Sequence, residues 1–170
     1  SGTLTIDNST INAKTMGVQV CAGSLSINAG SAITVSGDAV PKTENDGAIQ
    51  DGAAISIVNR TGYKGLGEIA VTGGTFTAKD ANAAIKAYKW ESQAESAFDA
   101  NDKVSVSGGT FSSAVKPEYC APGFEPKGND DGTYGVEINE NENRVAEVLD
   151  AQGNTVGAYD TLAAAITAAK

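Results

Sequence analysis

Short segments in which apolar residues alternate with Ser, Thr or another small residue recur along the first two-thirds of the chain. They are GTLTIDN at 2–8, GSLSINA at 23–29, AITVSG at 32–37, AISIVN at 54–59, EIAVTGGTFTA at 68–78 and KVSVSGGTFSSAV at 103–115. Because successive side chains of a strand point to opposite faces, this period of two predicts strands with one buried face. The residues expected to form one inward ladder are Leu4 and Ile6, Leu25 and Ile27, Ile55 and Ile57, Ile69 and Val71, and Val104 and Val106.

The intervals between these strands are long and irregular. They run 21 residues from Leu4 to Leu25, then 30 to Ile55, 14 to Ile69 and 35 to Val104. Hairpins need short turns, whereas parallel neighbours need long crossovers. The spacing therefore predicts an all-β parallel β-helix, a solenoid of about three to five coils with insertions, in which the shortest interval holds two strands of one coil. The alternative is an antiparallel sandwich with glycine-rich bulges.

The motif Gly-Gly-Thr-Phe occurs twice, at 73–76 and at 108–111. Glycine adopts a positive φ without a Cβ clash, so each glycine pair predicts a sharp corner between two faces of a coil. The Thr-Phe pair then begins the next strand. We expect Phe76 and Phe111 to point inward and to stack on each other across coils.

Other segments depart from the ladder. Residues 38–53 predict a polar, turn-rich loop, and residues 89–102 predict a short helical excursion or an outer flap. Further on, Asp131-Gly132 predicts a hairpin. Residues 144–150 and 155–159 predict a second hairpin, which precedes the C-terminal residues.

The last residues predict a helix that Asp160 or Thr161 can cap. Its apolar face would consist of Leu162, Ala165, Ile166 and Ala169. Since a short isolated helix is marginal in water, we expect the Leu162 and Ile166 face to pack on the open end of the solenoid or on a neighbouring copy. The chain thus divides into a β-helix at 1–136 and a hairpin-plus-helix tail at 137–170, either an end cap or the start of a following module.

Charge narrows the classes of partner. The net charge is -9, and the two Arg among 12 basic residues do not form the clustered basic patch that nucleic-acid binding needs. No apolar run approaches the roughly 20 residues of a spanning helix, which argues against membrane insertion. The chain opens in a strand-like segment and ends in a helix-like one, so we expect it to be a piece of a longer protein.

The residue types argue against catalysis. The chain has no His, which removes Ser-His and Cys-His triads. Its acidic residues fall mainly in turns, at Asp38, Glu44, Asp46, Asp51, Asp99, Asp102, Asp130 and Asp131. Segments 44–52 and 99–103 gather oxygen ligands, but neither has the spacing of a calcium loop, and Asx turns explain both. We expect no cofactor and no metal, and free thiols at Cys21 and Cys120.

The segment AIKAYKW at 84–90 contains the one Trp of the chain. If Ile85 and Ala87 face inward, then Lys86, Tyr88 and Trp90 face outward together. Two outward rings beside a cation predict a stacking platform for a sugar ring or an anchor for a protein partner. The alternative is that the following flap buries both rings.

The run SGGTFSSAVKPEYCAPGFEPKGNDDGTYGV at 107–136 resembles the closing segment of repeat modules in large surface proteins of gut-type anaerobic bacteria. A Gly-Gly-Thr-Phe turn, a Tyr, a Gly-aromatic-Glu and an Asp-Gly-Thr-Tyr hairpin recur there. AYDTLAAAITAA at 158–169 is similar to the short helix that opens each module. The resemblance implies a right-handed parallel β-helix of the pectate-lyase-like type. Because the opening helix stands at the C-terminus here, we expect the chain to run from one module into the start of the next.

The resemblance also implies a location and a role. We expect a secreted or cell-surface bacterial module, non-enzymatic, that acts as an adhesin, spacer or display scaffold and contacts neighbouring modules. Host or dietary glycans, or a surface protein, are the expected ligands. Because pectate-lyase-like folds are often carbohydrate enzymes, the alternative is a fragment of a polysaccharide lyase or hydrolase.

Overall fold

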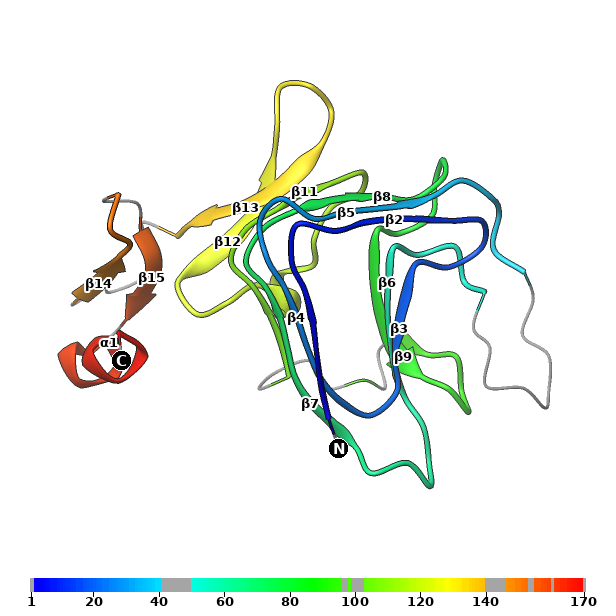
Figure 1. Cartoon of the computed structure of the whole chain (residues 1–170), viewed down its shortest axis with the longest axis horizontal. Helices are drawn as coiled ribbons and strands as arrows, with labels where there is room; N and C mark the ends of the chain where they lie inside the picture. Colours follow the sequence, from blue (N-terminus) through cyan, green and yellow to red (C-terminus); the bar gives the residue numbers. More distant parts are fainter. Residues whose placement is uncertain are drawn as a thin grey trace.

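The computed structural model describes residues 2–40, 50–95, 98, 103–139, 146–152, 155–159 and 161–169. Within these residues the chain is built mainly from strands, with an α-helix near the C-terminus (Figure 1). The expected all-β class is confirmed.

Three parallel sheets make up most of the molecule. Sheet A holds β1 (Thr3–Ile6), β4 (Gly23–Ile27), β7 (Leu66–Val71) and β10 (Val104–Val106). Sheet B holds β2 (Thr10–Ala13), β5 (Ala32–Val35), β8 (Thr75–Thr77) and β11 (Thr110–Phe111). Sheet C holds β3 (Val18–Val20), β6 (Ile55–Asn59) and β9 (Ile85–Lys89).

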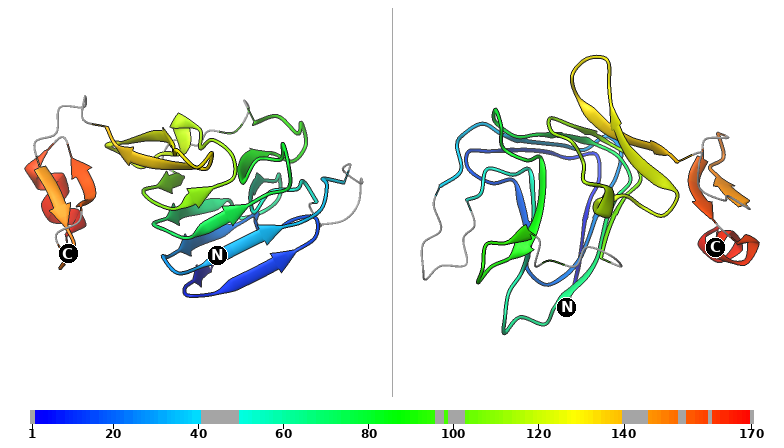
Figure 2. Two further views of the ribbon diagram at one scale, coloured as in Figure 1. Left: turned by 90° about the horizontal axis from the view of Figure 1, so that it is seen from above. Right: turned by 180° about the vertical axis from the view of Figure 1, so that it is seen from behind.

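The chain visits these sheets in a fixed order, from A to B to C and back to A (Figures 1 and 2). We call each passage a winding and the successive windings the stack. Each strand pairs in parallel with the strand of the same sheet in the next winding. This parallel pairing excludes the antiparallel sandwich.

The inward residues of sheet A stand in register across the windings. Leu4 pairs with Leu25, Leu25 with Ile69, and Ile69 with Val104. The expectation of one ladder is wrong at Ile55, which belongs to sheet C. Ile55 on β6 and Ile69 on β7, 14 residues apart, do not belong to one winding as expected, because β6 ends the winding that β4 begins and β7 begins the next.

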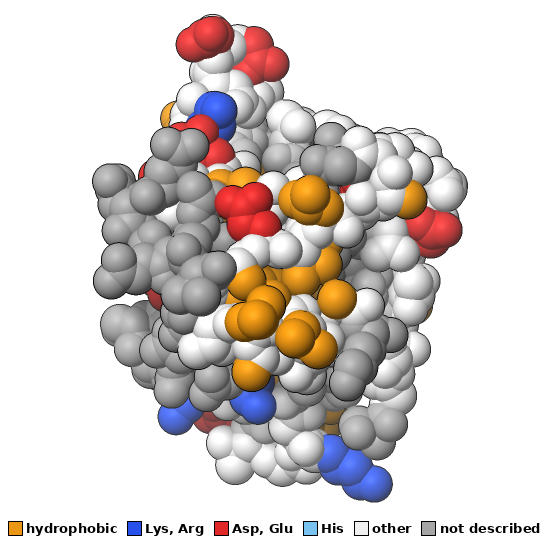
Figure 3. All heavy atoms as spheres, turned by 90° about the vertical axis from the view of Figure 1, so that its left-hand side faces the viewer, with side chains coloured by type: hydrophobic (Ala, Val, Ile, Leu, Met, Phe, Trp, Pro, Cys, Tyr) orange, Lys and Arg blue, Asp and Glu red, His pale blue; other side chains and the backbone are white. Residues whose placement is uncertain are grey.

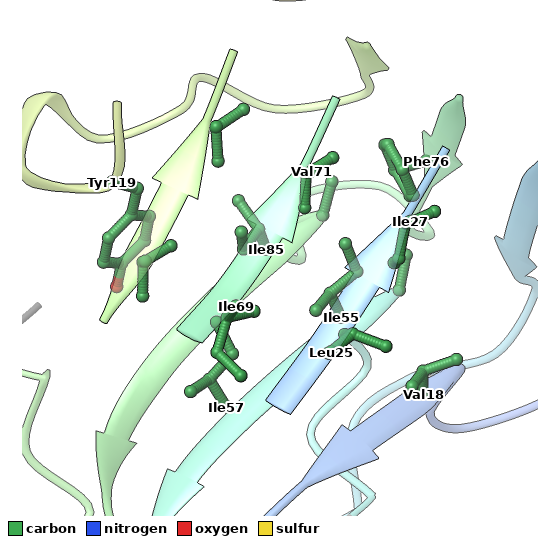
Figure 4. Close-up of a cluster of buried hydrophobic side chains, with 14 of the residues drawn as sticks. Val18, Leu25, Ile27, Ile55, Ile57, Ile69, Val71, Phe76, Ile85 and Tyr119 are labelled. Atoms are coloured by element: carbon green, nitrogen blue, oxygen red, sulfur yellow. The ribbon is translucent and has the colours of Figure 1, made fainter. Parts of the chain in front are cut away.

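Side chains from all three sheets fill the interior of the stack (Figure 4). The fully buried members are mostly branched aliphatic residues, including Leu25, Ile27, Ile33, Ile55, Ile57, Ile69 and Val71. β-Branched side chains fit a pleated surface well, and burial of each large apolar side chain contributes about 1.5 to 3 kcal/mol. The core therefore runs along the axis of the stack.

Glycine is required at the corners between sheets A and B for two reasons. The second glycine of each Gly-Gly-Thr-Phe motif has a positive φ, 113° at Gly74 and 110° at Gly109. At the first position the backbone of the preceding winding comes too close for a side chain, since a Cβ on Gly108 would lie 2.4 Å from the Thr72 carbonyl oxygen. The predicted corner is confirmed.

The phenylalanines of the two motifs stack inside the molecule. Phe76 and Phe111 pair in register between β8 and β11, and both are fully buried. Their ring centroids lie 4.9 Å apart with an interplanar angle of 25°. The predicted contact between windings is thus confirmed.

Residues 112–138 cover the C-terminal end of the stack. The hairpin of β12 (Phe124–Gly128) and β13 (Tyr134–Ile138), predicted at Asp131-Gly132, joins sheet B through an antiparallel pairing of β13 with β11. The 3-10 turn η2 (Pro117–Tyr119) places the Tyr119 ring in the core. The Tyr119 hydroxyl accepts the backbone N–H of Ala87 at 3.1 Å, and Ser113 Oγ accepts that of Ala84 at 2.8 Å. These side chains satisfy donors at the edge of β9.

The tail, which we define as residues 146–169, forms a separate hairpin and helix beside the stack (Figures 1 and 2). β14 (Ala146–Leu149) and β15 (Thr155–Tyr159) pair antiparallel, as predicted. Thr161 Oγ1 accepts the N–H of Ala164 at 3.1 Å and so caps α1 (Leu162–Ala168). Of the two expected caps, the helix therefore uses Thr161.

Of the two expected packings of α1, the one on the stack of its own chain is wrong, and the one on a neighbouring copy stays a prediction. The helix contacts β14 and β15 and buries Ala165 there. Leu162 and Ile166 remain 61% and 51% exposed, so this face does not pack on the stack of its own chain. The hairpin of β14 and β15 gives α1 the supporting surface that a short helix needs. The C-terminal end of the stack is covered by residues 112–138 instead.

Candidate functional site

The predicted aromatic platform lies on the outer face of sheet C. Ile85 and Ala87 point into the core, and Tyr88 pairs with Val58 on the opposite face, as the alternation predicts. The expected exposure is wrong, because Tyr88 is 2% and Trp90 8% exposed. Both rings pack with Val58 and Cys21 in a small apolar cluster outside the main core.

Asp51 holds one side of this cluster. The Tyr88 hydroxyl donates to Asp51 Oδ2 at 3.0 Å, and Asp51 Oδ1 accepts the Ser56 hydroxyl at 2.7 Å and the Ala53 N–H at 3.1 Å. Burial, reinforced by the negative charge of Asp51, raises the pKa of Tyr88, which stays a neutral donor. The carboxylate thus joins the connection before β6 to sheet C.

Arg60 covers the other side. Its guanidinium carbon lies 4.3 Å from the centroid of the Trp90 ring and 5.2 Å from that of Tyr63. Arg60 Nη1 is buried and has no hydrogen-bond partner among the described residues, so ring contacts hold this end of the side chain. Nearby, Glu91 Oε1 accepts the N–H of Thr61 at 2.8 Å. These contacts tie the connection after β6 to the one after β9.

We call Asp51, Arg60, Tyr88 and Trp90 the loop anchor, because they join chain connections to the outer face of sheet C. Lys86, the third predicted site residue, is partly exposed beside it, with Nζ 5.3 Å from the centroid of the Tyr88 ring. The predicted residues therefore do lie together. They form an anchoring cluster rather than an open platform.

The connections around sheet C are the variable part of the windings. Those from sheet A to sheet B are short in all windings, at 7–9, 28–31, 72–74 and 107–109. The connections from sheet B to sheet C are 14–17, 36–54 and 78–84. The connections from sheet C back to sheet A are 21–22, 60–65 and 90–103. Residues 91–95 of the predicted flap form turns without an α-helix. Insertions thus gather where the loop anchor lies.

Tyr63 is the exposed aromatic residue of this region. Its ring is 49% exposed, with the Arg60 guanidinium beside it. The sequence pattern did not single it out, because Arg-Thr-Gly-Tyr at 60–63 follows the strand as an ordinary turn. An aromatic residue in the turn that directly follows a strand is the signal that could have found it.

A hollow of about 450 Å³ lies on the outer side of sheet A, near its C-terminal end. It is lined by Glu68, Lys103, Val104, Ser105, Glu118, Cys120 and Pro122. Burial, together with the charges of Glu118 and Glu125, raises the pKa of Cys120 to about 11. The thiol is therefore protonated at neutral pH and a poor nucleophile. The groups of the hollow that could take part in chemistry are therefore the carboxylates of Glu68 and Glu118 and the amine of Lys103.

Cys21 and Cys120 are both free, as predicted. Among the described residues no group of three or more His, Cys, Asp or Glu could hold a metal ion, and no helix is long and apolar enough to cross a membrane. Most of the two oxygen-rich segments, 44–52 and 99–103, lies outside the described residues.

Comparison of the chain with protein families, curated proteins and solved structures finds no match. The features that bear on function are therefore the windings, the loop anchor with its connections, and the hollow.

Proposed function

We propose that the chain is a right-handed parallel β-helix module of an extracellular bacterial surface protein, and that it acts without catalysis as an adhesin, spacer or display scaffold. Support for the β-helix comes from the parallel register of three sheets that the chain visits in a fixed order. Crossovers between parallel strands are right-handed with few exceptions, which supports the handedness. The resemblance of residues 107–136 to bacterial surface modules supports the location.

The proposed display role is supported by one observation, the lengths of the connections between the sheets. Connections of very different length emerge on both sides of sheet C, while each corner between sheets A and B has only three or four residues. The loop anchor fastens these connections to the stack through Asp51 and Arg60. A rigid scaffold with variable, anchored loops is a common design for binding surfaces.

Tyr63 is the ligand contact that we propose on this surface, in place of Tyr88 and Trp90. Its exposed ring offers a face to a sugar ring or to an apolar side chain of a protein partner. Stacking contributes on the order of 0.5 to 1.5 kcal/mol beyond the area it buries, so one module binds weakly and repeated modules gain by avidity.

A glycan array read with the native chain, Tyr63→Ala and Trp90→Ala tests this proposal. We expect binding of the native chain to be lost in Tyr63→Ala at an unchanged melting temperature. Trp90→Ala should lose binding together with stability, because it removes the ring that holds Arg60. Full binding by Tyr63→Ala would remove Tyr63 as the contact.

A polysaccharide lyase or hydrolase is the second candidate, and the hollow is the observation that favours it. Glu68 on β7 and Glu118 on η2 both line the hollow, and a hydrolase needs two carboxyl groups that face one cleft. A screen on pectin, alginate and host glycans decides between the candidates. Turnover by the native chain that Glu118→Gln abolishes would replace the scaffold proposal with the enzyme.

A further inference from the structure

Arg60 places an unpaired cation beside Tyr63, the proposed ligand contact. Its guanidinium carbon lies over the Tyr63 ring, 5.2 Å from the centroid. Nη1 is the one side-chain nitrogen of Arg60 that is buried without a hydrogen-bond partner. Nε and Nη2 make no hydrogen bond to a described residue either, and the residue as a whole is only half-buried. The edge of the guanidinium that Nε and Nη2 form therefore reaches the surface with its donors unused.

The Trp90 ring holds this guanidinium in place from the strand side. The guanidinium carbon lies 4.3 Å from the Trp90 centroid, and Trp90 itself is 8% exposed. An arginine that is fixed by ring contacts loses little freedom when it binds a ligand. Its planar fork of donors matches the two oxygens of a carboxylate. The group that Arg60 recognises best is thus a carboxylate.

Two lysines add positive charge to the same surface. Lys64 directly follows Tyr63 in the chain, and Lys89 pairs with the residue that precedes Arg60. Both lysines are exposed, and neither forms an ion pair with a described residue. Against these three cations stands the carboxylate of Glu91, which accepts a backbone N–H at 2.8 Å. The local balance of charge is positive.

The molecule as a whole has the opposite sign. Its net charge is -9. On the side that carries the tail, hydrophobic side chains gather (Figure 3), and residues 146–169 contain three acidic residues and no basic one. At physiological ionic strength exposed charges more than about 8 Å apart are largely screened from each other. The cations around Tyr63 therefore decide the charge of the ligand there, and they favour an anion.

The arrangement of Arg60 and Tyr63 restricts how one ligand can use both. The guanidinium lies over one face of the Tyr63 ring, and the side chain is 49% exposed, so a sugar stacks on the other face. A single acidic sugar on that face would have the Tyr63 ring between its carboxylate and Arg60. The carboxylate must therefore come from the next sugar residue, where the glycan passes the edge of the ring.

We propose that the ligand is an acidic oligosaccharide, in which a sugar that stacks on Tyr63 adjoins a uronic acid whose carboxylate binds Arg60. This inference rests on the proposed role of Tyr63 as the ligand contact and names the class of glycan that the contact takes. Trp90 is a positioning residue, since it acts through Arg60.

Two matched probes test the inference on the native chain. One is a hyaluronan tetrasaccharide, in which a neutral amino sugar alternates with glucuronate, and the other is its carboxyl methyl ester, which keeps the sugar rings and removes the charge. We expect the acid to bind at least about tenfold more tightly, a difference of about 1.4 kcal/mol. Titration followed by proton–nitrogen NMR measures both affinities, and the largest shifts should fall on the backbone amides of residues 60–65. This comparison needs no substitution, so it does not depend on how a variant folds.

Arg60→Lys tests the fork of donors. It keeps the charge and the ring contact, so it should weaken binding of the acid by about two- to tenfold, the contribution of one hydrogen bond, and leave binding of the ester unchanged. Lys14→Gln is the matched control, because it removes an exposed cation outside this surface and should bind both probes like the native chain.

The outcomes separate this inference from the proposed function. If acid and ester bind equally and Tyr63→Ala loses both, the ligand is not acidic, while Tyr63 remains the contact. Undiminished binding of the acid by Arg60→Lys would also overturn the pairing of Arg60 with a carboxylate. If neither probe binds, or if Tyr63→Ala binds both like the native chain, Tyr63 is not the contact and the inference fails with it.

Discussion

The stacked pair of Phe76 and Phe111 gives a direct measure of how neighbouring windings hold together. Both rings are fully buried, and their centroids lie 4.9 Å apart. The perturbation that isolates their mutual contact is a double-mutant cycle of Phe76→Leu, Phe111→Leu and the double variant. Leucine keeps each position apolar while it removes the ring.

The structure sets the expected magnitudes. Phe111→Ala should lower the free energy of unfolding by about 3 to 5 kcal/mol, because it removes a buried ring and leaves a cavity. In a chain of this length 1 kcal/mol shifts Tm by roughly 2 to 4 °C, so this variant should melt about 6 to 20 °C lower. In the leucine cycle, the coupling should be about 0.5 to 1.5 kcal/mol, the range for an aromatic pair beyond its buried area.

Urea unfolding followed by circular dichroism measures the four free energies of the cycle. A second cycle of Phe76→Leu with Val20→Ala, whose residues lie in different sheets and windings, is the control and should be additive within about 0.3 to 0.5 kcal/mol. If the phenylalanine cycle is additive within the same limits, the stacked geometry adds nothing beyond burial. The reasoning about the Gly-Gly-Thr-Phe motif would then be refuted.

Three further predictions follow from single residues. Gly108→Ala should lower Tm, because its Cβ would lie 2.4 Å from a carbonyl oxygen of the preceding winding, whereas Gly128→Ala, with nothing within 4 Å, should leave Tm unchanged. Burial raises the pKa of Tyr88 above the value of about 10 for an unfolded tyrosine, so the unfolded chain loses its proton first and stability should fall as the pH rises above about 10. In urea melts at several pH values, Tyr88→Phe should flatten this alkaline loss. The Cys120 thiol, with a pKa of about 11, should react slowly with iodoacetamide at pH 8 and faster as the pH approaches 11. Rapid labelling of Cys120 at pH 8 in a mass-spectrometric time course would contradict that value.

The strands of sheet A could be predicted from the sequence, whereas two strands of the first winding could not. β4 has Leu25 and Ile27 on its inward face, so its period of two is visible. β2 and β3 are four and three residues long. β1 and β10 are equally short, but their large apolar residues alternate with Ser or Thr, whereas β2 has one large apolar residue and β3 alternates with Gln. Pairing with β5 and β6 decides the place of β2 and β3.

The candidate site, too, could be predicted from the sequence only in part. Alternation along β9 correctly placed Tyr88 on the face opposite Ile85, because it depends on the strand alone. The burial of Tyr88 depends on Asp51, 37 residues earlier, and that of Trp90 involves Arg60 from another winding. No local pattern encodes such contacts, so the sequence predicted the face of the rings and gave their burial as an alternative, but it did not identify Asp51 and Arg60 as the residues that contact them.

The loop anchor also explains how long connections fit on a regular stack. The connection at 36–54 has 19 residues, against four at 14–17 in the winding before it. Closing the longer loop costs about 1.4 kcal/mol more, from the logarithmic dependence of loop entropy on length. A hydrogen bond to a charged group contributes about 1.5 to 3 kcal/mol, so the bond from Tyr88 to Asp51 is large enough to offset that cost. Because the corner glycines and the Phe pair stabilise the windings independently, the stack can accept connections of different length at sheet C wherever an anchoring contact of this size forms.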